Sequence, residues 1–143
     1  MNAIQYFSNS PFLIVNPDTI WHSNYLKEMR LMEKLFFENK KNMCSLLIVK
    51  KEKSFDKSFK GDFNLKNNLI KRNEGDNLNY IYTGMQIIKP QVFSGVDLKV
   101  FSINKIWNKL IETNELYGVE SNNNFLHVST LDVYKNLLEK FKR

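Results

Sequence analysis

The sequence predicts an α/β domain, and two patterns carry that prediction. Short apolar runs typical of strands alternate along the chain with longer stretches whose apolar residues recur at helical spacing. No linker, internal repeat or low-complexity stretch interrupts this alternation. With 143 residues, of which 43% are hydrophobic, the chain is large enough to bury one core. We therefore expect a single domain spanning residues 1–143.

The first three elements are predicted to form one β-α-β unit. Residues 12–16 form a continuous apolar run that ends in a polar residue, which is typical of a strand buried on both faces of a parallel sheet. Pro17 ends this strand, because proline has no N–H to donate. Residues 24–39 have helical spacing, and residues 43–50 form a second apolar strand. We expect a right-handed crossover between the two strands.

The middle of the chain is predicted to hold a loop and three strands. Residues 50–60 are charged and are expected to be exposed, and residues 61–65 and 68–72 form two short strands. Residues 79–88 form a longer strand that contains Gly84. A glycine within a strand marks a bulge or a place where a ligand approaches the backbone.

The last third is predicted to contain two helices and two closing strands. The first helix follows Ser102 or Asn104 and runs to about residue 112, and the strands span residues 116–119 and 125–128. Thr130 or Asp132 caps the final helix. The side chains of this helix that we expect to face inward are Tyr134, Leu137, Leu138 and Phe141.

Composition narrows the classes of function. The net charge is +6, but 18 of the 21 basic residues are lysines spread along the chain, so we expect no nucleic-acid binding. No apolar run approaches the roughly 18 residues of a membrane span, and the first residues do not resemble a secretory signal. The single cysteine, Cys44, excludes an internal disulfide. A cytoplasmic location fits these features best.

Several segments, taken in order, resemble bacterial sugar-1-phosphate nucleotidyltransferases, and in particular those acting on mannose-1-phosphate or N-acetylmuramate-1-phosphate. The segments are residues 11–18 (PFLIVNPD), 61–63 (GDF), 82–88 (YTGMQII), 101–107 (FSINKIW), 116–119 (LYGV) and 125–130 (FLHVST). None is specific by itself, but their order and spacing cover nearly the whole chain. The resemblance implies a Rossmann-like nucleotide-diphospho-sugar transferase fold, with a mixed sheet and flanking helices.

The resemblance also implies a reaction and a set of site residues. In the family, a sugar-1-phosphate attacks the α-phosphorus of a nucleoside triphosphate and pyrophosphate leaves, with Mg²⁺ on the phosphates. The aspartate of the family's Asn-x-Asp motif binds that metal, and here this position is Asp18. His127 stands where many members have a second metal-binding aspartate, although we favour a half-buried histidine with both nitrogens satisfied. The sugar side is expected to include Asn16, Thr83 and Gly84.

The departures from the family concern the nucleotide. Family members begin with a glycine-rich loop whose N–H groups hold the triphosphate. The five glycines of this chain lie at positions 61, 75, 84, 95 and 118, so no two form Gly-x-Gly. We therefore expect the C-terminal part of a nucleotidyltransferase, truncated at its N-terminus, with Mg²⁺ binding weak or absent. The closing motif differs too, with Phe125, Ser129 and Leu131 replacing the family's tryptophan, glycine and proline.

Several interpretations remain open at this point. The favoured one is a fragment with no activity of its own, and the alternatives are half of a split enzyme completed by a separate N-terminal chain, or a module that binds a sugar-1-phosphate without catalysis. Residues 12–16 would be a central strand in the complete fold, so we expect an open sheet edge here and self-association. If a sugar phosphate binds, a bulky residue at Gly84 is expected to remove binding without unfolding the protein.

Overall fold

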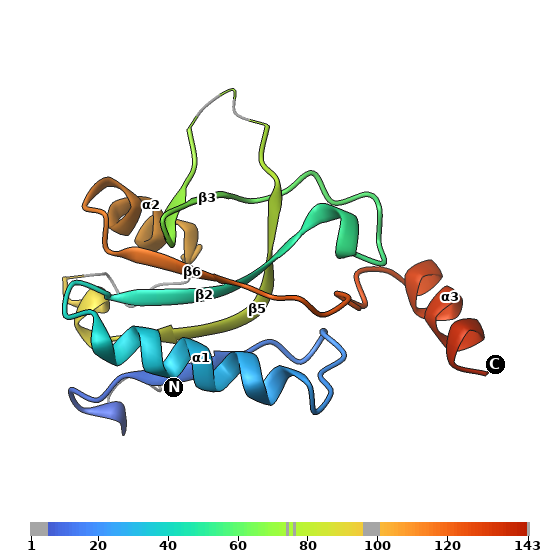
Figure 1. The fold of residues 1–143 in the computed structure, drawn as a ribbon, viewed down its shortest axis with the longest axis horizontal. Helices are drawn as coiled ribbons and strands as arrows, with labels where there is room; N and C mark the ends of the chain where they lie inside the picture. The colour runs from blue at the N-terminus through green and yellow to red at the C-terminus, as the bar shows by residue number, and fades with distance from the viewer. Residues whose placement is uncertain (1–5, 74, 76, 96–100, 143) are drawn as a thin grey trace.

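A computed structural model describes residues 6–73, 75, 77–95 and 101–142. Its centre is a mixed sheet of six strands in the order β1-β5-β2-β6-β4-β3. The strands are β1 (Phe12–Val15), β2 (Cys44–Lys50), β3 (Asn64–Lys66), β4 (Leu69–Lys71), β5 (Tyr80–Ile88) and β6 (Leu116–Glu120). The helices are α1 (Tyr25–Glu38), α2 (Asn104–Glu112) and α3 (Leu131–Phe141). The α/β class and the mixed sheet with flanking helices are confirmed (Figure 1).

Two helices cover opposite faces of the sheet, and the alternation of side chains along β2 explains why. Leu46 and Ile48 join the cluster that packs against α2, whereas Leu47 between them joins the cluster that packs against α1. All three are fully buried. Since successive side chains of a strand point to opposite faces, a continuous apolar run needs cover on both sides. The prediction of an apolar strand at residues 43–50 is therefore correct.

Strand β1 departs from the sequence prediction. It lies at the edge of the sheet and pairs with β5 in antiparallel orientation. Its residues alternate between half-buried and exposed, and the exposed fractions of Leu13 and Val15 are 42% and 43%. Phe12 and Ile14 pack against the α2-side cluster. The predicted burial on both faces is wrong, because no helix covers the second face of β1 among the described residues.

The two strands of the predicted β-α-β unit are not direct neighbours in the sheet. β1 and β2 are both antiparallel to β5, so they run in the same direction, but β5 lies between them. The chain thus leaves β1, passes through α1, and returns two strands away. A parallel neighbour for β2 does exist, and it is β6.

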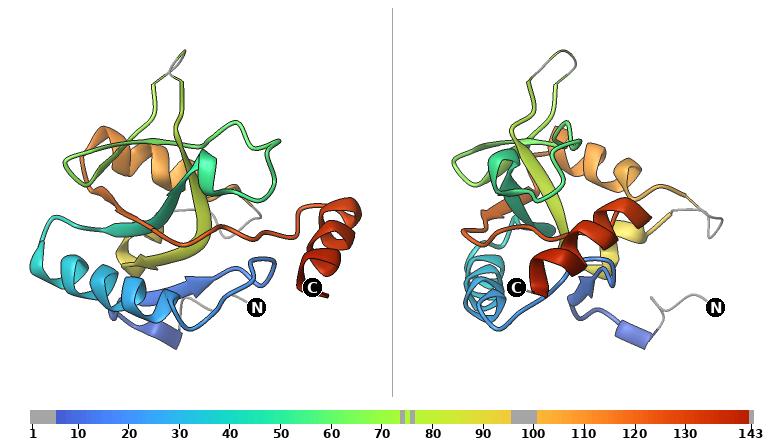
Figure 2. Two further views of the ribbon diagram at one scale, coloured as in Figure 1. Left: turned by 45° about the vertical axis from the view of Figure 1, so that its right-hand side comes forward. Right: turned by 90° about the vertical axis from the view of Figure 1, so that its right-hand side faces the viewer.

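Gly84 lies at an irregularity of β5, as its position within the strand predicted. Opposite β2, the register moves from Leu46–Gln86 to Ile48–Tyr82, so β5 advances by more residues than β2. Gly84 itself has φ +94°, a left-handed conformation that costs other residues free energy. The bulge bends β5, and both views of Figure 2 show this strand crossing the centre of the fold.

The end of the chain shows two further differences. Residues 125–128 form isolated bridges, between Phe125 and Ser54 and between His127 and Thr19, instead of a strand. Thr130 caps α3 as predicted, since its side chain accepts a hydrogen bond from the Val133 N–H at 3.2 Å. The predicted inward face of this helix is wrong, because only Leu137 is buried. The exposed fractions are 44% for Tyr134, 40% for Leu138 and 60% for Phe141.

A polar contact is enclosed in the α2-side core. The Trp107 Nε1–H donates to Gln86 Oε1 at 3.1 Å, and the Cys44 thiol donates to the same oxygen at 3.4 Å. All three residues are buried, and burial raises the pKa of the Cys44 thiol, so this group stays protonated and inert. No helix of the described residues has the length and hydropathy needed to cross a membrane.

We expect Trp107→Phe to lower the free energy of unfolding by about 1–3 kcal/mol, because a buried acceptor loses its stronger donor. Adding Gln86→Leu should recover most of this loss, since removing both partners is close to neutral. Urea unfolding followed by circular dichroism measures both variants. A double variant as unstable as the sum of its single variants would contradict the assignment of the cost to the Gln86 oxygen.

Candidate functional site

The candidate site forms where the segment after β1 meets the segment before α3. The Ile20 N–H donates to the Leu126 carbonyl at 2.8 Å, and the Val128 N–H donates to the Asp18 carbonyl at 2.8 Å. Between these bonds, Thr19 and His127 form an antiparallel bridge. Because Pro17 ends β1, the chain is free to leave the sheet and make this second pairing. Two residues predicted from separate motifs, Asp18 and His127, are thereby brought together.

The side chains of Asp18 and His127 are in direct contact. His127 Nε2 lies 3.2 Å from Asp18 Oδ2, and the exposed side-chain fractions are 20% for His127 and 46% for Asp18. The imidazole also packs against Phe59 and Phe125, whose ring centroids each lie 5.6 Å from that of His127. Of the two side chains, the Asp18 carboxylate is therefore the more accessible to solvent.

The second nitrogen of His127 has an unusual environment. His127 Nδ1 is buried and has no hydrogen-bond partner among the described residues. This favours the neutral tautomer in which Nε2–H donates to Asp18, since a proton on Nδ1 would be a buried donor without an acceptor. The expectation that both nitrogens are satisfied is therefore wrong for Nδ1.

A second carboxylate lies beside this pair. Asp56 Oδ2 accepts a hydrogen bond from the Ser129 hydroxyl at 2.6 Å, and Asp56 Oδ1 accepts one from the Ser58 N–H at 2.9 Å. These hydrogen bonds, from Ser129 first, lower the pKa of Asp56. Sequence analysis missed Asp56, because no motif marks it. Ser129, which replaces a family glycine, here supplies the hydroxyl that fixes this carboxylate.

Asn16 and Gly84 are packed against each other. The Asn16 N–H donates to the Gly84 carbonyl at 2.8 Å, and the Asn16 carbonyl accepts from Trp21 Nε1–H at 2.9 Å. A Cβ atom added to Gly84 would lie 2.7 Å from Asn16 Cβ, which is closer than van der Waals contact allows. The small size of Gly84 therefore makes room for Asn16. A role for either residue in binding sugar stays a prediction.

Thr83 connects the bulge of β5 to the segment that carries Asp18. Its hydroxyl donates to the Leu47 carbonyl at 2.9 Å, and its own carbonyl accepts from the Thr19 hydroxyl at 2.8 Å. Only 1% of Thr83 is exposed, so its hydroxyl faces the protein interior. Its predicted contact with sugar stays untested. The described contacts link all five predicted site residues into one cluster at the C-terminal end of β1.

The cluster contains few side chains that could act as ligands of a metal ion. Among the described residues, no three histidine, cysteine, aspartate or glutamate side chains gather as metal ligands. Magnesium is commonly held by one or two carboxylates, with water and substrate phosphates completing its octahedral coordination. The exposed carboxylate of Asp18 fits that pattern. His127 does not, since ligation through Nε2 would place a proton on the buried Nδ1, which lacks the acceptor that metal-binding histidines usually have.

Comparison with known proteins identifies the fold as that of sugar-phosphate nucleotidyltransferases. An inositol-1-phosphate CTP transferase from T. maritima matches with a TM-score of 0.68 and 17% identity, over 99% of this chain and 60% of that chain. A Bacillus anthracis protein described as a glucose-1-phosphate thymidylyltransferase matches with a TM-score of 0.66 and 18% identity, over 94% of this chain and 55% of that chain. HddC from Yersinia pseudotuberculosis matches with a TM-score of 0.59 and 16% identity, over 98% of this chain and 59% of that chain.

These matches confirm the expected fold, and at such low identity they are likenesses of fold. This chain spans 55–60% of the length of the three solved chains, which is consistent with the expected part of a nucleotidyltransferase. No family model and no curated protein matches the sequence.

Proposed function

We propose that this chain provides the Asp18 side of a sugar-1-phosphate nucleotidyltransferase site, and that a nucleotide-binding portion outside the described residues completes it. The observation that carries the proposal is the convergence of Asp18 and His127, which come from two separate family-like motifs and lie 3.2 Å apart at the end of β1. Ligands of α/β sheets bind beyond the carboxyl ends of strands, which agrees with this position.

The proposed reaction joins a sugar-1-phosphate to a nucleotide. An oxygen of the sugar phosphate forms a bond to the α-phosphorus, and the bond from that phosphorus to the bridging oxygen of pyrophosphate breaks. Bound Mg²⁺ would supply positive charge to the phosphate oxygens. In this chain, Asp18 would hold the ion, and the Nε2–H of His127 would keep the Asp18 carboxylate in one orientation.

The glycines of the chain support the need for a second portion. Added Cβ atoms at Gly61, Gly84 and Gly118 would each collide with protein atoms, so these glycines serve internal packing. Gly75 and Gly95 have open space around them, at separate turns. None of the five adjoins another as in the family's glycine-rich loop, whose consecutive N–H groups hold phosphates.

The first N–H groups of α1 are not free to bind a phosphate either. The N–H groups of Tyr25, Leu26 and Lys27 donate to carbonyls of the preceding turn, at His22, Ser23 and Asn24. A helix N-terminus binds anions through its unpaired N–H groups, so these contacts weaken that role here. The triphosphate must therefore be held by groups outside the described part of this chain.

We expect the isolated chain to release no pyrophosphate above background from CTP and inositol-1-phosphate in the presence of Mg²⁺. Loss of a single preorganised donor typically costs several kcal/mol of transition-state stabilisation, and the described residues of this chain hold no set of free N–H groups for the triphosphate. A fusion that places the N-terminal portion of the T. maritima enzyme ahead of Met1, through a flexible linker, should catalyse the reaction, because the linker raises the effective concentration of the two portions.

The N-terminal portion without this chain is the matched control, and it should also be inactive. Pyrophosphate release is measured for all three proteins at equal concentration. Turnover by the unfused chain would contradict the requirement for a second portion. An inactive fusion in which both portions are folded, as judged by circular dichroism, would contradict the proposed function.

A further inference from the structure

We propose that a pocket between the segment after β2 and helix α3 binds a small anion that carries phosphate. We call it the lysine pocket, because Lys53, Lys57 and Lys140 line it, together with Phe55, Asn124 and Leu126. Its volume is about 350 Å³. Neither Asp18 nor His127 belongs to the lining, so this inference goes beyond the proposed function and does not rest on it.

The walls of the lysine pocket are held in place by hydrogen bonds. The Phe125 N–H donates to the Lys53 carbonyl, and the Phe55 N–H donates to the Phe125 carbonyl, each at 2.9 Å. The Ser54 hydroxyl donates to the Asp56 carbonyl at 2.8 Å, which fixes the turn that follows. Because these bonds join the two segments that form one side of the pocket, a ligand would meet a site that is already formed.

Helix α3 brings the third lysine to the pocket. The helix lies beyond the end of the sheet at which β2 leads into residues 51–57 (Figure 1). Leu137 is the buried residue of α3, and Lys140, three residues further on, shares its face of the helix. The Lys140 Nζ lies 5.3 Å from the centroid of the Phe55 ring. This cation–π contact holds the Lys140 ammonium group at the pocket.

The positive charge of the three lysines is not offset by ion pairs. Lys53 Nζ donates to the Asn122 carbonyl at 2.8 Å and to Asn122 Oδ1 at 3.3 Å, and Lys57 Nζ donates to the Glu52 carbonyl at 2.9 Å. These neutral oxygens orient the two ammonium groups, and each group keeps at least one proton for a ligand. Within the described part of the chain, none of the three lysines forms an ion pair with a carboxylate. The pocket is therefore a preorganised cluster of cations.

Charge and size together select the ligand. Three ammonium groups around one cavity repel one another, and an anion with two or more negative charges removes that repulsion. A phosphate group has nearly two negative charges at neutral pH and several acceptor oxygens, and lysine binds it as a point charge. The volume is at the lower end of the range for small-molecule pockets, roughly 300–1,000 Å³. Phosphate and pyrophosphate fit this description.

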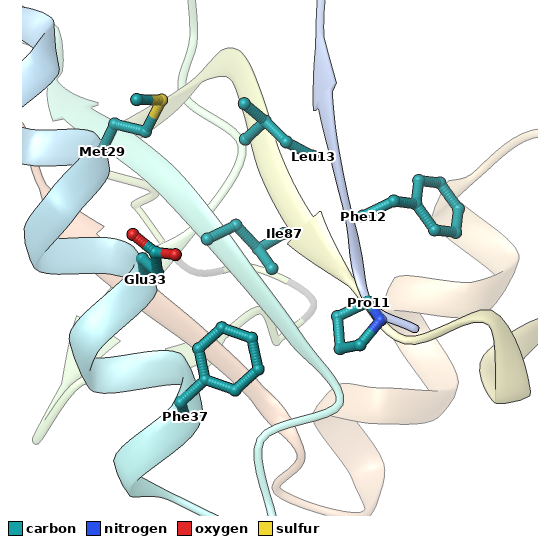
Figure 3. Close-up of a pocket in the computed structure, with 7 residues that line it drawn as sticks. All are labelled: Pro11, Phe12, Leu13, Met29, Glu33, Phe37 and Ile87. Carbon is teal, nitrogen blue, oxygen red and sulfur yellow. The ribbon is translucent and has the colours of Figure 1, made fainter. Parts of the chain in front are cut away.

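Two other hollows of the surface lack this combination. The groove between β1 and α1, shown in Figure 3, has Glu33 as its charged lining residue, and its other lining residues are apolar. A pocket beside α2 contains the cation of Arg72. That guanidinium already donates to the Asp62 carbonyl and to the side-chain oxygens of Asn104 and Asn108. The lysine pocket is therefore better suited than either to an anion with several charges.

Calorimetric titration of the chain with inorganic pyrophosphate tests the proposal. EDTA is present, so that no divalent metal links the anion to Asp18. We expect saturable binding of one pyrophosphate per chain, with inorganic phosphate binding more weakly. Lys140→Gln should weaken pyrophosphate binding about tenfold, because one charge-assisted contact is lost. Lys135→Gln is the matched control, since it makes the same charge change at an exposed position of α3 outside the pocket, and it should retain the affinity of the unmodified chain.

Lys57→Gln, on the opposite wall of the pocket, gives an independent variant if circular dichroism shows that Lys140→Gln is unfolded, and it should show a similar loss. Absence of saturable binding would overturn the proposal. Equal weakening in Lys140→Gln and Lys135→Gln would also overturn it, because the net charge of +6, and not the pocket, would then attract the anion. A short single-stranded oligonucleotide that displaces pyrophosphate equally from both variants would assign the surface to nucleic acid, with the same consequence. None of these results bears on the proposed reaction at Asp18.

Discussion

Gly84→Ala is expected to lower the free energy of unfolding by about 3 kcal/mol. A left-handed backbone costs a residue with a Cβ atom roughly 1–2 kcal/mol, and overpacking a filled site adds about 1–3 kcal/mol. Both terms apply, because Gly84 has φ +94° and its new Cβ would lie 2.7 Å from Asn16 Cβ. This expectation replaces the one drawn from the sequence, that a bulky residue at Gly84 would remove binding without unfolding the protein.

Gly75→Ala is the control that separates the two terms. Gly75 has φ +80°, and nothing lies within 4 Å of an added Cβ, so only the backbone term applies. We expect this variant to lose about 1 kcal/mol, and the double variant Asn16→Gly/Gly84→Ala to recover part of the larger loss. Urea unfolding gives all three values. Equal losses at Gly84 and Gly75 would show that the contact with Asn16 carries no cost.

The sequence predicted which segments form strands and helices better than it predicted how those elements pair and pack with one another. The strand of residues 43–50, the helix of α1 and the bulge at Gly84 follow from patterns of the residues themselves. An apolar run such as residues 12–15 is compatible with a central strand or an edge strand, and its place here is decided by pairing with β5, far along the chain. The same limit explains α3, whose amphipathic pattern identifies an apolar stripe but not what covers it.

Part of the candidate site was likewise predicted from the sequence, and part of it was missed. Asp18 and His127 were found because each lies in a segment that resembles a family motif, and the structure brings them together. Asp56 was missed, because its environment depends on Ser129, which is distant in sequence and lies in a segment where the family motif has changed. The unpaired Nδ1 of His127 was missed as well, since only the packing around a ring decides whether each nitrogen meets a partner.

We propose that Asp18 is the carboxylate that binds Mg²⁺ in this site. Asp18→Asn in the fusion is the most direct test of this proposal, because asparagine keeps the shape of the side chain and removes the charge. We expect kcat/KM for CTP and inositol-1-phosphate to fall about 100-fold, equivalent to about 2.7 kcal/mol of transition-state stabilisation. The thermal unfolding temperature should change little, since Asp18 is 46% exposed.

Asp132→Asn, which makes the same chemical change at an exposed position on α3, should retain the activity of the fusion. The decisive measurement is therefore the ratio of kcat/KM between these two variants in the same fusion. We expect a ratio near 1:100 for Asp18→Asn against Asp132→Asn. Equal activity of the two folded variants would contradict it, because the carboxylate at the end of β1 would then have no part in the reaction.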